Sequence, residues 1–245
     1  MNIDLNCDLG EGAGHDDRLM PLITSANIAC GGHAGDVESM RAAVLLAIRH
    51  GVAIGAHPGF PDRANFGRRE QAIDPLDAAK MVAGQIAALR DVAVACGARI
   101  RHVKPHGALY NQAVREAALA EAIAAAVWDA DPALVLVGLA GSQLLVAGRV
   151  RGLRVASEVF ADRTYQRDGS LTPRTHDDAL ITDEGAAIRQ VLMIIGKGRV
   201  RATDGTDVAV SVDSVCIHGD GPHPVEFARR LRMELGAAGI EVRAL

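Results

Sequence analysis

Residues that could carry out chemistry are spread along the whole chain in short clusters. Most clusters place a carboxylate, a histidine or a lysine next to glycine or proline: Asn6-Cys7-Asp8-Leu9-Gly10-Glu11, Gly31-Gly32-His33, His57-Pro58, Lys104-Pro105-His106-Gly107, Glu158 with Asp162-Arg163, and His218-Gly219-Asp220. Carboxylates activate water, histidines transfer protons, and lysine or arginine stabilises developing negative charge. The sequence has no G-x-x-x-x-G-K-[ST] phosphate loop and no G-x-S-x-G nucleophile elbow. These residue types favour hydrolysis by activated water.

The elements that must position these clusters are predicted from hydrophobic patterning. Short β-branched segments alternate with longer segments of helical period, as in repeated βα units around a parallel sheet. Seven strands are predicted, at residues 3–7, 25–29, 52–56, 100–104, 134–138, 153–157 and 215–218. Because the carboxyl ends of all strands in a parallel barrel meet at one mouth, we expect the clusters to converge on one pocket.

Two predicted helices have recognisable ends. Asp36 is placed to cap a helix that stops at Gly51. Asp74 precedes Pro75 at the first position of another helix, which stops at Gly97. Both segments are expected to form helices between strands.

Two segments depart from the simple βα alternation. Residues 199–212 contain Asp204-Gly205 between two β-rich runs, which predicts a small β-hairpin inserted before the last strand. Residues 160–180 are too long for an ordinary connection and are a candidate lid. No linker or shift in composition divides the chain, so residues 1–245 are predicted to form a single (β/α)-barrel domain.

Several candidate residues have a structural alternative. Asp36 and Asp220 precede predicted helices, where a cap is commoner than a catalyst. His33 and His102 are candidates for hydrogen-bonded structural histidines, whereas Lys104 within an apolar strand is costly to bury without a partner. Three cysteines beside or within strands are expected to be small buried side chains: Cys7, Cys30 and Cys216.

Composition excludes several classes of protein. Hydrophobic residues make up 49% of the chain and charged residues 23%, which is the balance of a globular protein with a large core. The net charge of -4 and the lack of a basic tract argue against binding to nucleic acid. No signal peptide or apolar run of the ~18 residues that span a membrane is recognisable. The four cysteines lie far apart without a C-x-x-C pair, so a reducing cytoplasm is expected.

Longer stretches of the chain resemble the LamB/YcsF family essentially from end to end. The resemblance is carried by residues 6–11, 25–36, 55–58, 66–69, 103–111 and 158–163, by Tyr165, Gly169, Leu171 and Arg174, and by residues 218–220. It implies a fold similar to the seven-stranded parallel (β/α) barrel of the glycoside hydrolase and deacetylase superfamily. This agrees with the strand count.

The resemblance also implies an activity and partners. The implied reaction opens 5-oxo-L-proline to L-glutamate with hydrolysis of ATP, together with 5-oxoprolinase subunits B and C. ATP, with Mg²⁺, is the implied co-substrate of the complex, and association into a homo-oligomer is left open. Because phosphorylation of the lactam oxygen would give water a better electrophile, and this chain lacks a phosphate loop, phosphorylation is assigned to the partners and ring opening to this chain.

Roles are assigned to the residues at the strand ends. Asp8 and Glu11 are expected to activate water, His57 and His106 to transfer protons, and Lys104 to stabilise the developing oxyanion. The expected substrate-binding residues are Arg68, Arg69 and Arg163, for a carboxylate or phosphate, together with Asn6, Asn27, His33, Glu158 and His218.

Two alternatives accompany this hypothesis. In the first, Asp8 with His33 or His57 holds a divalent metal ion that activates water in a deacetylase-like reaction. In the second, the barrel only binds a small acid and regulates or scaffolds its partners.

Overall fold

The structure is a computed structural model that describes residues 1–218 and 223–245. Within these residues, seven parallel strands follow one another around a closed barrel, because the last strand of the series pairs with the first. In order around the ring they are β1 (Asn2–Leu9), β2 (Ser25–Ala29), β3 (Ala53–His57), β4 (His102–Val103), β5 (Val135–Leu139), β6 (Arg154–Phe160) and β9 (Ser214–Ile217). The predicted α/β fold with a seven-stranded parallel (β/α) barrel is confirmed.

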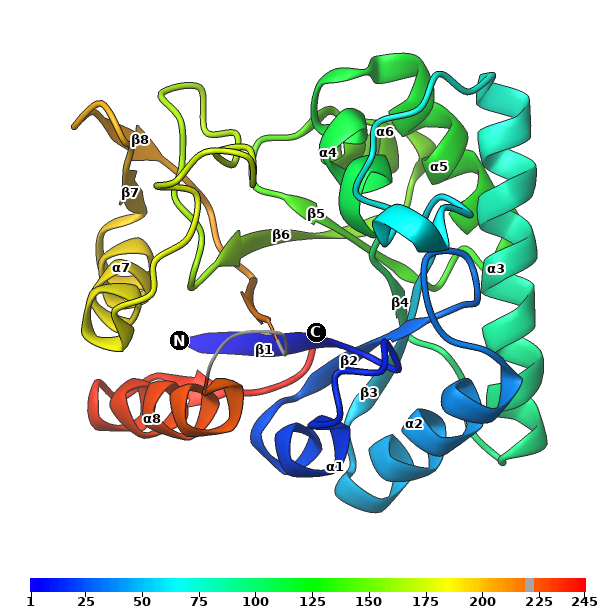
Figure 1. Cartoon of the computed structure of the whole chain (residues 1–245), viewed down its shortest axis with the longest axis horizontal. Coiled ribbons are helices and arrows are strands. Elements are labelled where there is room, and N and C mark those ends of the chain that lie inside the picture. The colour runs from blue at the N-terminus through cyan, green and yellow to red at the C-terminus, as the bar shows by residue number, and fades with distance from the viewer. Residues whose placement is uncertain (219–222) are drawn as a thin grey trace.

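Helices cover the outside of the barrel, as Figure 1 shows. They are α1 (Asp16–Leu19), α2 (Val37–His50), α3 (Pro75–Ala95), α4 (Gly107–Arg115), α5 (Ala117–Ala130), α6 (Gln143–Arg151), α7 (Glu184–Lys197) and α8 (Pro224–Ala237), with short 3-10 helices η1 (Met20–Leu22) and η2 (Arg63–Asn65). The predicted caps are present: the Asp36 side chain accepts a hydrogen bond from the Ser39 amide, and Asp74 accepts one from the Leu76 amide. Gly51 ends α2 with the left-handed φ of 67° that favours glycine.

Strand lengths differ from the prediction at three of the strands that position charged residues of the site. β1 runs on to Leu9, so Asp8 lies inside the strand rather than after it. β4 has only two residues, so Lys104 follows the strand rather than closing it, although its amide still bonds to the Ala56 carbonyl on β3. β6 runs on to Phe160, because its last residues pair with β9, and Glu158 therefore lies inside the strand. The pattern located all three strands but placed the ends of β1 and β6 too early and the end of β4 too late.

Three segments lie outside the barrel ring. The predicted hairpin is confirmed as β7 (Arg199–Arg201) paired antiparallel with β8 (Asp207–Ala209), at the upper left of Figure 1. A further strand that was not predicted, β10 (Glu241–Val242), pairs with the start of β1. Residues 160–180 fold back on themselves through bridges such as Tyr165 with Leu171.

The interior of the barrel is polar near its first strand. Side chains on a strand alternate between its two faces, and the series Asp4, Asn6 and Asp8 faces inward, where the three bond to residues of other strands. Leu5 and Cys7 face outward into the hydrophobic core between strands and helices. Barrel interiors are usually filled by branched apolar residues, so this interior reserves unusual space for polar groups. No helix among the described residues is long and apolar enough to cross a membrane.

Candidate active site

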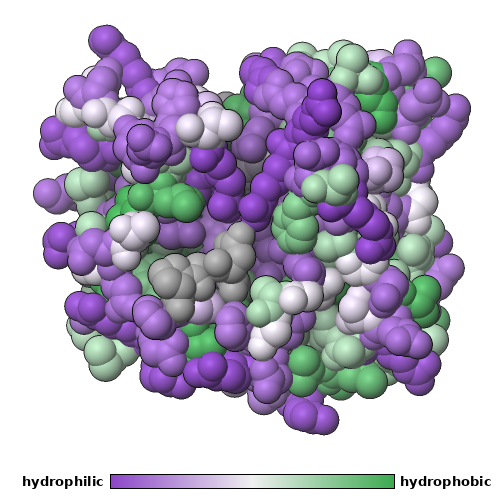
Figure 2. All heavy atoms as spheres, viewed as in Figure 1, coloured by the Kyte–Doolittle hydropathy of each residue, from purple (hydrophilic) through white to green (hydrophobic). Residues whose placement is uncertain are grey.

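A pocket of about 610 Å³ lies at the carboxyl ends of the strands, within the size range of small-molecule sites. Figure 2 shows hydrophilic side chains gathered around the hollow in the middle of this face. All five residues predicted to be catalytic line the pocket: Asp8, Glu11, His57, Lys104 and His106. The expected convergence of distant strand ends is therefore present in the structure.

The floor of the pocket is a buried ion-pair network centred on Lys104. The Lys104 Nζ atom lies 2.9 Å from Asp8 Oδ1 and 2.8 Å from Glu158 Oε1, and it also contacts Asn6 Oδ1 and Cys216 Sγ. The Lys104 side chain is 2% exposed and that of Glu158 is fully buried, whereas Asp8 is 11% exposed toward the pocket. Asp8 is the carboxylate of this network that a ligand can reach.

Amide side chains fix the geometry of the floor from below. Asn27 accepts a hydrogen bond from His102 Nε2 and donates to Asn6 Oδ1 and to Asp8 Oδ1. Asn6 in turn donates to Glu158. Burial lowers the pKa of His102 to about 3, so this ring is neutral and acts as a structural donor.

Burial and charge act in opposite directions on the two ions of the floor. Burial raises the pKa of Asp8, but the positive charges of His57 and Lys104 outweigh burial and hold that pKa well below its usual range. Burial lowers the pKa of Lys104, yet its negative neighbours, chiefly Asp8, raise that pKa well above its ordinary value. Both groups are ionised, and each keeps the other so.

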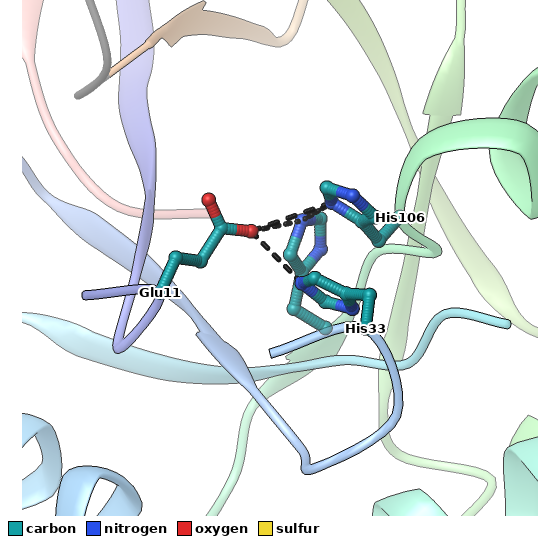
Figure 3. Close-up of side chains that lie close together, drawn as sticks. Glu11, His33 and His106 are labelled. Atoms are coloured by element: carbon teal, nitrogen blue, oxygen red, sulfur yellow. Dashed lines mark hydrogen bonds and ion pairs between the residues drawn. The ribbon is translucent and has the colours of Figure 1, made fainter. Parts of the chain in front are cut away.

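Beside the floor, Glu11 meets three histidines (Figure 3). The Glu11 Oε1 atom lies 2.9 Å from His33 Nε2, 3.4 Å from His106 Nδ1 and 3.8 Å from His57 Nε2. Asp8 Oδ2 is 3.2 Å from the same His57 nitrogen, which joins the histidines to the ion-pair network.

Hydrogen bonds to the backbone set the tautomers of two of these rings. His57 Nδ1 donates to the Lys104 carbonyl at 2.7 Å, and His106 Nε2 donates to the Phe66 carbonyl at 2.9 Å. Burial and the neighbouring histidines lower the pKa of His106, so its Nδ1 is an acceptor for His57 Nε2 at 3.0 Å. Burial lowers the pKa of His57, but the charge of Asp8 outweighs burial and raises it.

The remaining predicted residues, apart from Arg69, divide into pocket walls and buried supports. Arg68, Arg163 and His218 line the pocket, and the Arg68 guanidinium lies over the Phe66 ring at 4.8 Å. Arg163 is buried and spends two donors on the carbonyls of Thr172 and Ala179, so it also holds segment 160–180 in place. Arg69 is exposed and does not line the pocket. Asn6, Asn27, His33 and Glu158 lie behind its surface.

Sequence reasoning assigned no role to several residues that complete the site. The Tyr110 hydroxyl, from α4, donates to Glu158 Oε2 at 2.7 Å and lines the pocket. Asp4 accepts from the hydroxyls of Thr24, Ser25 and Ser214 beneath the floor. The alternate positions of Asp4, Asn6 and Asp8, each two residues after the last, were the available signal for Asp4.

Other expectations concerned structural roles. Cys7, Cys30 and Cys216 are buried as predicted, and burial raises the pKa of each thiol. The cap predicted at Asp220 lies outside the described residues, as does Gly219.

The fold and the site define a parallel (β/α)-barrel protein with acid–base residues gathered at the carboxyl ends of its strands. The LamB/YcsF family model matches residues 3–245, and the chain belongs to that family. A relative in Geobacillus kaustophilus strain HTA426, named as the A subunit of 5-oxoprolinase, is 57% identical over 99% of this chain and 96% of its own length. One of the same name in Bordetella pertussis strain Tohama I is 55% identical over 99% of this chain and 98% of its own.

A solved structure agrees over the whole length. The crystal structure of a lactam utilization protein from Thermus thermophilus superposes with a TM-score of 0.92 at 47% identity, covering 100% of both chains. The barrel and its connections are therefore shared with a protein whose name refers to lactams.

Proposed function

We propose that this chain is the A subunit of an ATP-dependent 5-oxoprolinase and that its pocket is where the lactam of 5-oxo-L-proline is opened to L-glutamate. The names of its relatives point to a cyclic amide as substrate. The structural observation that carries the proposal is the Asp8–Lys104–Glu158 network at the floor of a small-molecule pocket.

Opening a lactam makes three chemical demands. Water must lose a proton as it adds to the carbonyl carbon, negative charge grows on the carbonyl oxygen, and the ring nitrogen must gain a proton when the carbon–nitrogen bond breaks. Asp8 is the proposed proton acceptor, because its carboxylate is ionised and reaches the pocket. Lys104, next to Asp8, supplies a fixed positive charge that is proposed to stabilise the negative charge on the carbonyl oxygen. The roles expected of Glu11 in water activation and of His57 and His106 in proton transfer stay predictions.

The substrate also carries a carboxylate, which needs a cationic partner. Arg68 and Arg163 line the same pocket as Asp8. Arg68 and Arg163 are both candidates to bind the substrate carboxylate, and Arg163 also shapes the wall of the pocket, because two of its donors are bonded to backbone carbonyls.

ATP, with Mg²⁺, is proposed to be used on partner subunits B and C, because this chain has no phosphate-loop motif. Separately purified subunits mixed with labelled ATP and 5-oxoproline test this division of labour. We expect the partners to form the phosphorylated lactam without this chain. Phosphorylation of the lactam by this chain alone would contradict the assignment.

The function as a whole is tested by reconstitution. Subunits B and C are mixed with 5-oxoproline, ATP and Mg²⁺, and glutamate release is measured with and without this chain. We expect release only when all three subunits are present. Near-normal release without this chain would overturn the proposal and favour a regulatory subunit that only binds a small acid.

A further inference from the structure

Three donor atoms converge on one point next to the pocket floor. They are Glu11 Oε1, His57 Nε2 and His106 Nδ1, and their separations are 3.0, 3.4 and 3.8 Å. The nearest point equidistant from all three lies in their plane, about 2.0 Å from each, which matches the length of a zinc–nitrogen or zinc–oxygen bond. The spacing therefore fits an ion among these atoms without a change in the backbone.

In the rings of His57 and His106, the nitrogen that faces away from the proposed ion is hydrogen-bonded, as in most metal-binding histidines. A ligating histidine donates its other nitrogen to a carbonyl or carboxylate, which fixes the tautomer and aims the free lone pair at the ion. His57 makes this bond to the Lys104 carbonyl and His106 makes it to the Phe66 carbonyl. Phe66 adopts a left-handed φ of 53°, the single non-glycine residue with positive φ in the described chain, and this conformation places its carbonyl against His106.

His33 has a different part in the cluster. Its ring is stacked on that of His106 with centroids 3.6 Å apart and planes within 5°. Lone pairs of parallel stacked rings lie in separate planes, so the two rings cannot both point at one ion. His33 Nε2 instead contacts Glu11 Oε1 at 2.9 Å, and a Cβ on Gly59 would stand 2.6 Å from the other His33 nitrogen. His33 is therefore a positioning residue for the Glu11 carboxylate.

We propose that Glu11, His57 and His106 bind a divalent transition-metal ion of the Zn²⁺ class. Two imidazoles and a carboxylate suit zinc, cobalt or iron better than magnesium, which prefers oxygen ligands and water. Three protein ligands leave a fourth position, and because all three residues line the pocket that position faces the substrate space, as in catalytic zinc sites.

This ligand set differs from Asp8 with His33 or His57, which the sequence suggested. Asp8 Oδ1 is bonded to Lys104 and Asn27, and Asp8 Oδ2 lies 3.2 Å from His57 Nε2. The group of mutually close ligand atoms around Glu11 contains the three histidines and not Asp8, so we place Asp8 beside the ion. If an ion were bound, Glu11, His57 and His106 would hold it and the ion could activate water, and Asp8 beside it would remain the candidate proton acceptor. Ion binding is measured without any assay of ring opening, so its failure would leave the proposed function standing.

The test is metal binding by the purified full chain. After removal of metals with a chelator, the protein is titrated with Zn²⁺ or Co²⁺ alone, and bound metal is measured by mass spectrometry together with the visible absorption of Co²⁺. We expect one ion per chain with a tetrahedral Co²⁺ spectrum. Glu11→Gln and His106→Asn should each weaken binding by more than about 100-fold, and His33→Asn by about 10- to 100-fold, the usual effect of an outer partner.

His218→Asn is the matched control. His218 lines the same pocket and belongs to a second group of possible ligands, with Asp8 and Cys216. Its variant therefore distinguishes binding at the proposed site from binding at that second group. It should bind metal like the wild type. No binding by the wild type, unchanged affinity in correctly folded Glu11→Gln, or loss of the ion in His218→Asn would each overturn the proposal. Glu11 lies partly at the pocket surface, so the isosteric glutamine variant is expected to fold, and circular dichroism checks this.

Discussion

Lys104 carries its charge where water hardly reaches. Removing an ammonium group from water costs several kcal/mol, and its attraction to buried carboxylates offsets this only when the geometry is good. The distances of 2.9 Å to Asp8 and 2.8 Å to Glu158 meet that condition. If Lys104 were replaced, Glu158 would remain fully buried without the cation that it pairs with. Removing Lys104 is therefore expected to cost more stability than the ion pairs contribute, because it leaves a buried carboxylate unpaired.

The variant Lys104→Met tests this dependence. We expect the free energy of unfolding, measured by urea denaturation at pH 7, to fall by about 3–5 kcal/mol, the typical effect of breaking a buried pair. Lys80→Met is the control, because Lys80 pairs with Asp77 on the exposed face of α3 and should change stability by no more than about 1 kcal/mol. Equal effects of the two changes would show that burial does not set the strength of the Lys104 pairs.

Asp162, which pairs with the pocket residue His218, provides a pH-dependent test. Burial raises its pKa, but the charge and hydrogen bond of His218 and the charge of Arg174 outweigh burial and lower it. A lowered folded-state pKa contributes stability above the unfolded value of about 3.9, and this contribution is lost as the pH falls through the folded value. Asp162→Asn should therefore destabilise the protein at pH 6–7, with a difference from wild type that shrinks below about pH 4. A constant difference across this range, in denaturation measured at each pH, would contradict the assignment.

At the scale of elements, β3 and β4 fit together because β3 has a glycine, without a side chain, where it faces His102 of β4. Gly55 on β3 is in register with His102 on β4, and a Cβ on Gly55 would lie 2.0 Å from His102 Nε2. The same ring donates to Asn27, which orients Asp8. A glycine within a strand therefore sets the position of a hydrogen-bonding chain that ends in the pocket.

Gly55→Ala should be destabilising for this reason. We expect a loss of about 1–3 kcal/mol or more, as for other insertions into a packed core. Gly84→Ala in the middle of α3 is the matched control: nothing lies within 4 Å of its added methyl group, and alanine in a helix should raise stability by about 0.5–1 kcal/mol. Thermal or urea unfolding of both variants decides the point, and a shift of the same sign in both would refute the steric argument.

Much of the element order could be predicted because hydrophobic period and helix caps are local properties. The caps at Asp36 and Asp74 and the turn at Asp204-Gly205 follow from short sequence signals, and all three are present. The two-residue strand β4 and the added strand β10 depend on pairing with distant segments. A single sequence holds little information on such pairing, so these ends were placed less well.

At the scale of the molecule, closure of the barrel brings together residues from distant parts of the chain. The strand ends predicted the convergence of Asp8, His57 and Lys104, because a parallel arrangement fixes which ends meet. The positions of the strand ends did not predict which side chains reach the pocket surface. Arg69, next to Arg68, is exposed and does not line the pocket. Nor did these positions predict Tyr110 on Glu158, since that contact depends on how α4 leaves β4.

The most direct test of the account is the Asp8→Asn variant in the reconstituted assay with subunits B and C. The substitution keeps the size of the side chain and removes the carboxylate that we propose accepts a proton from water. We expect glutamate release to fall by about 10²–10⁴-fold, the usual contribution of a general base, while folding is retained. Asp17→Asn, at an exposed position of α1, should release glutamate at the wild-type rate. A wild-type rate of release in Asp8→Asn would contradict the central claim that the floor of this pocket opens the lactam.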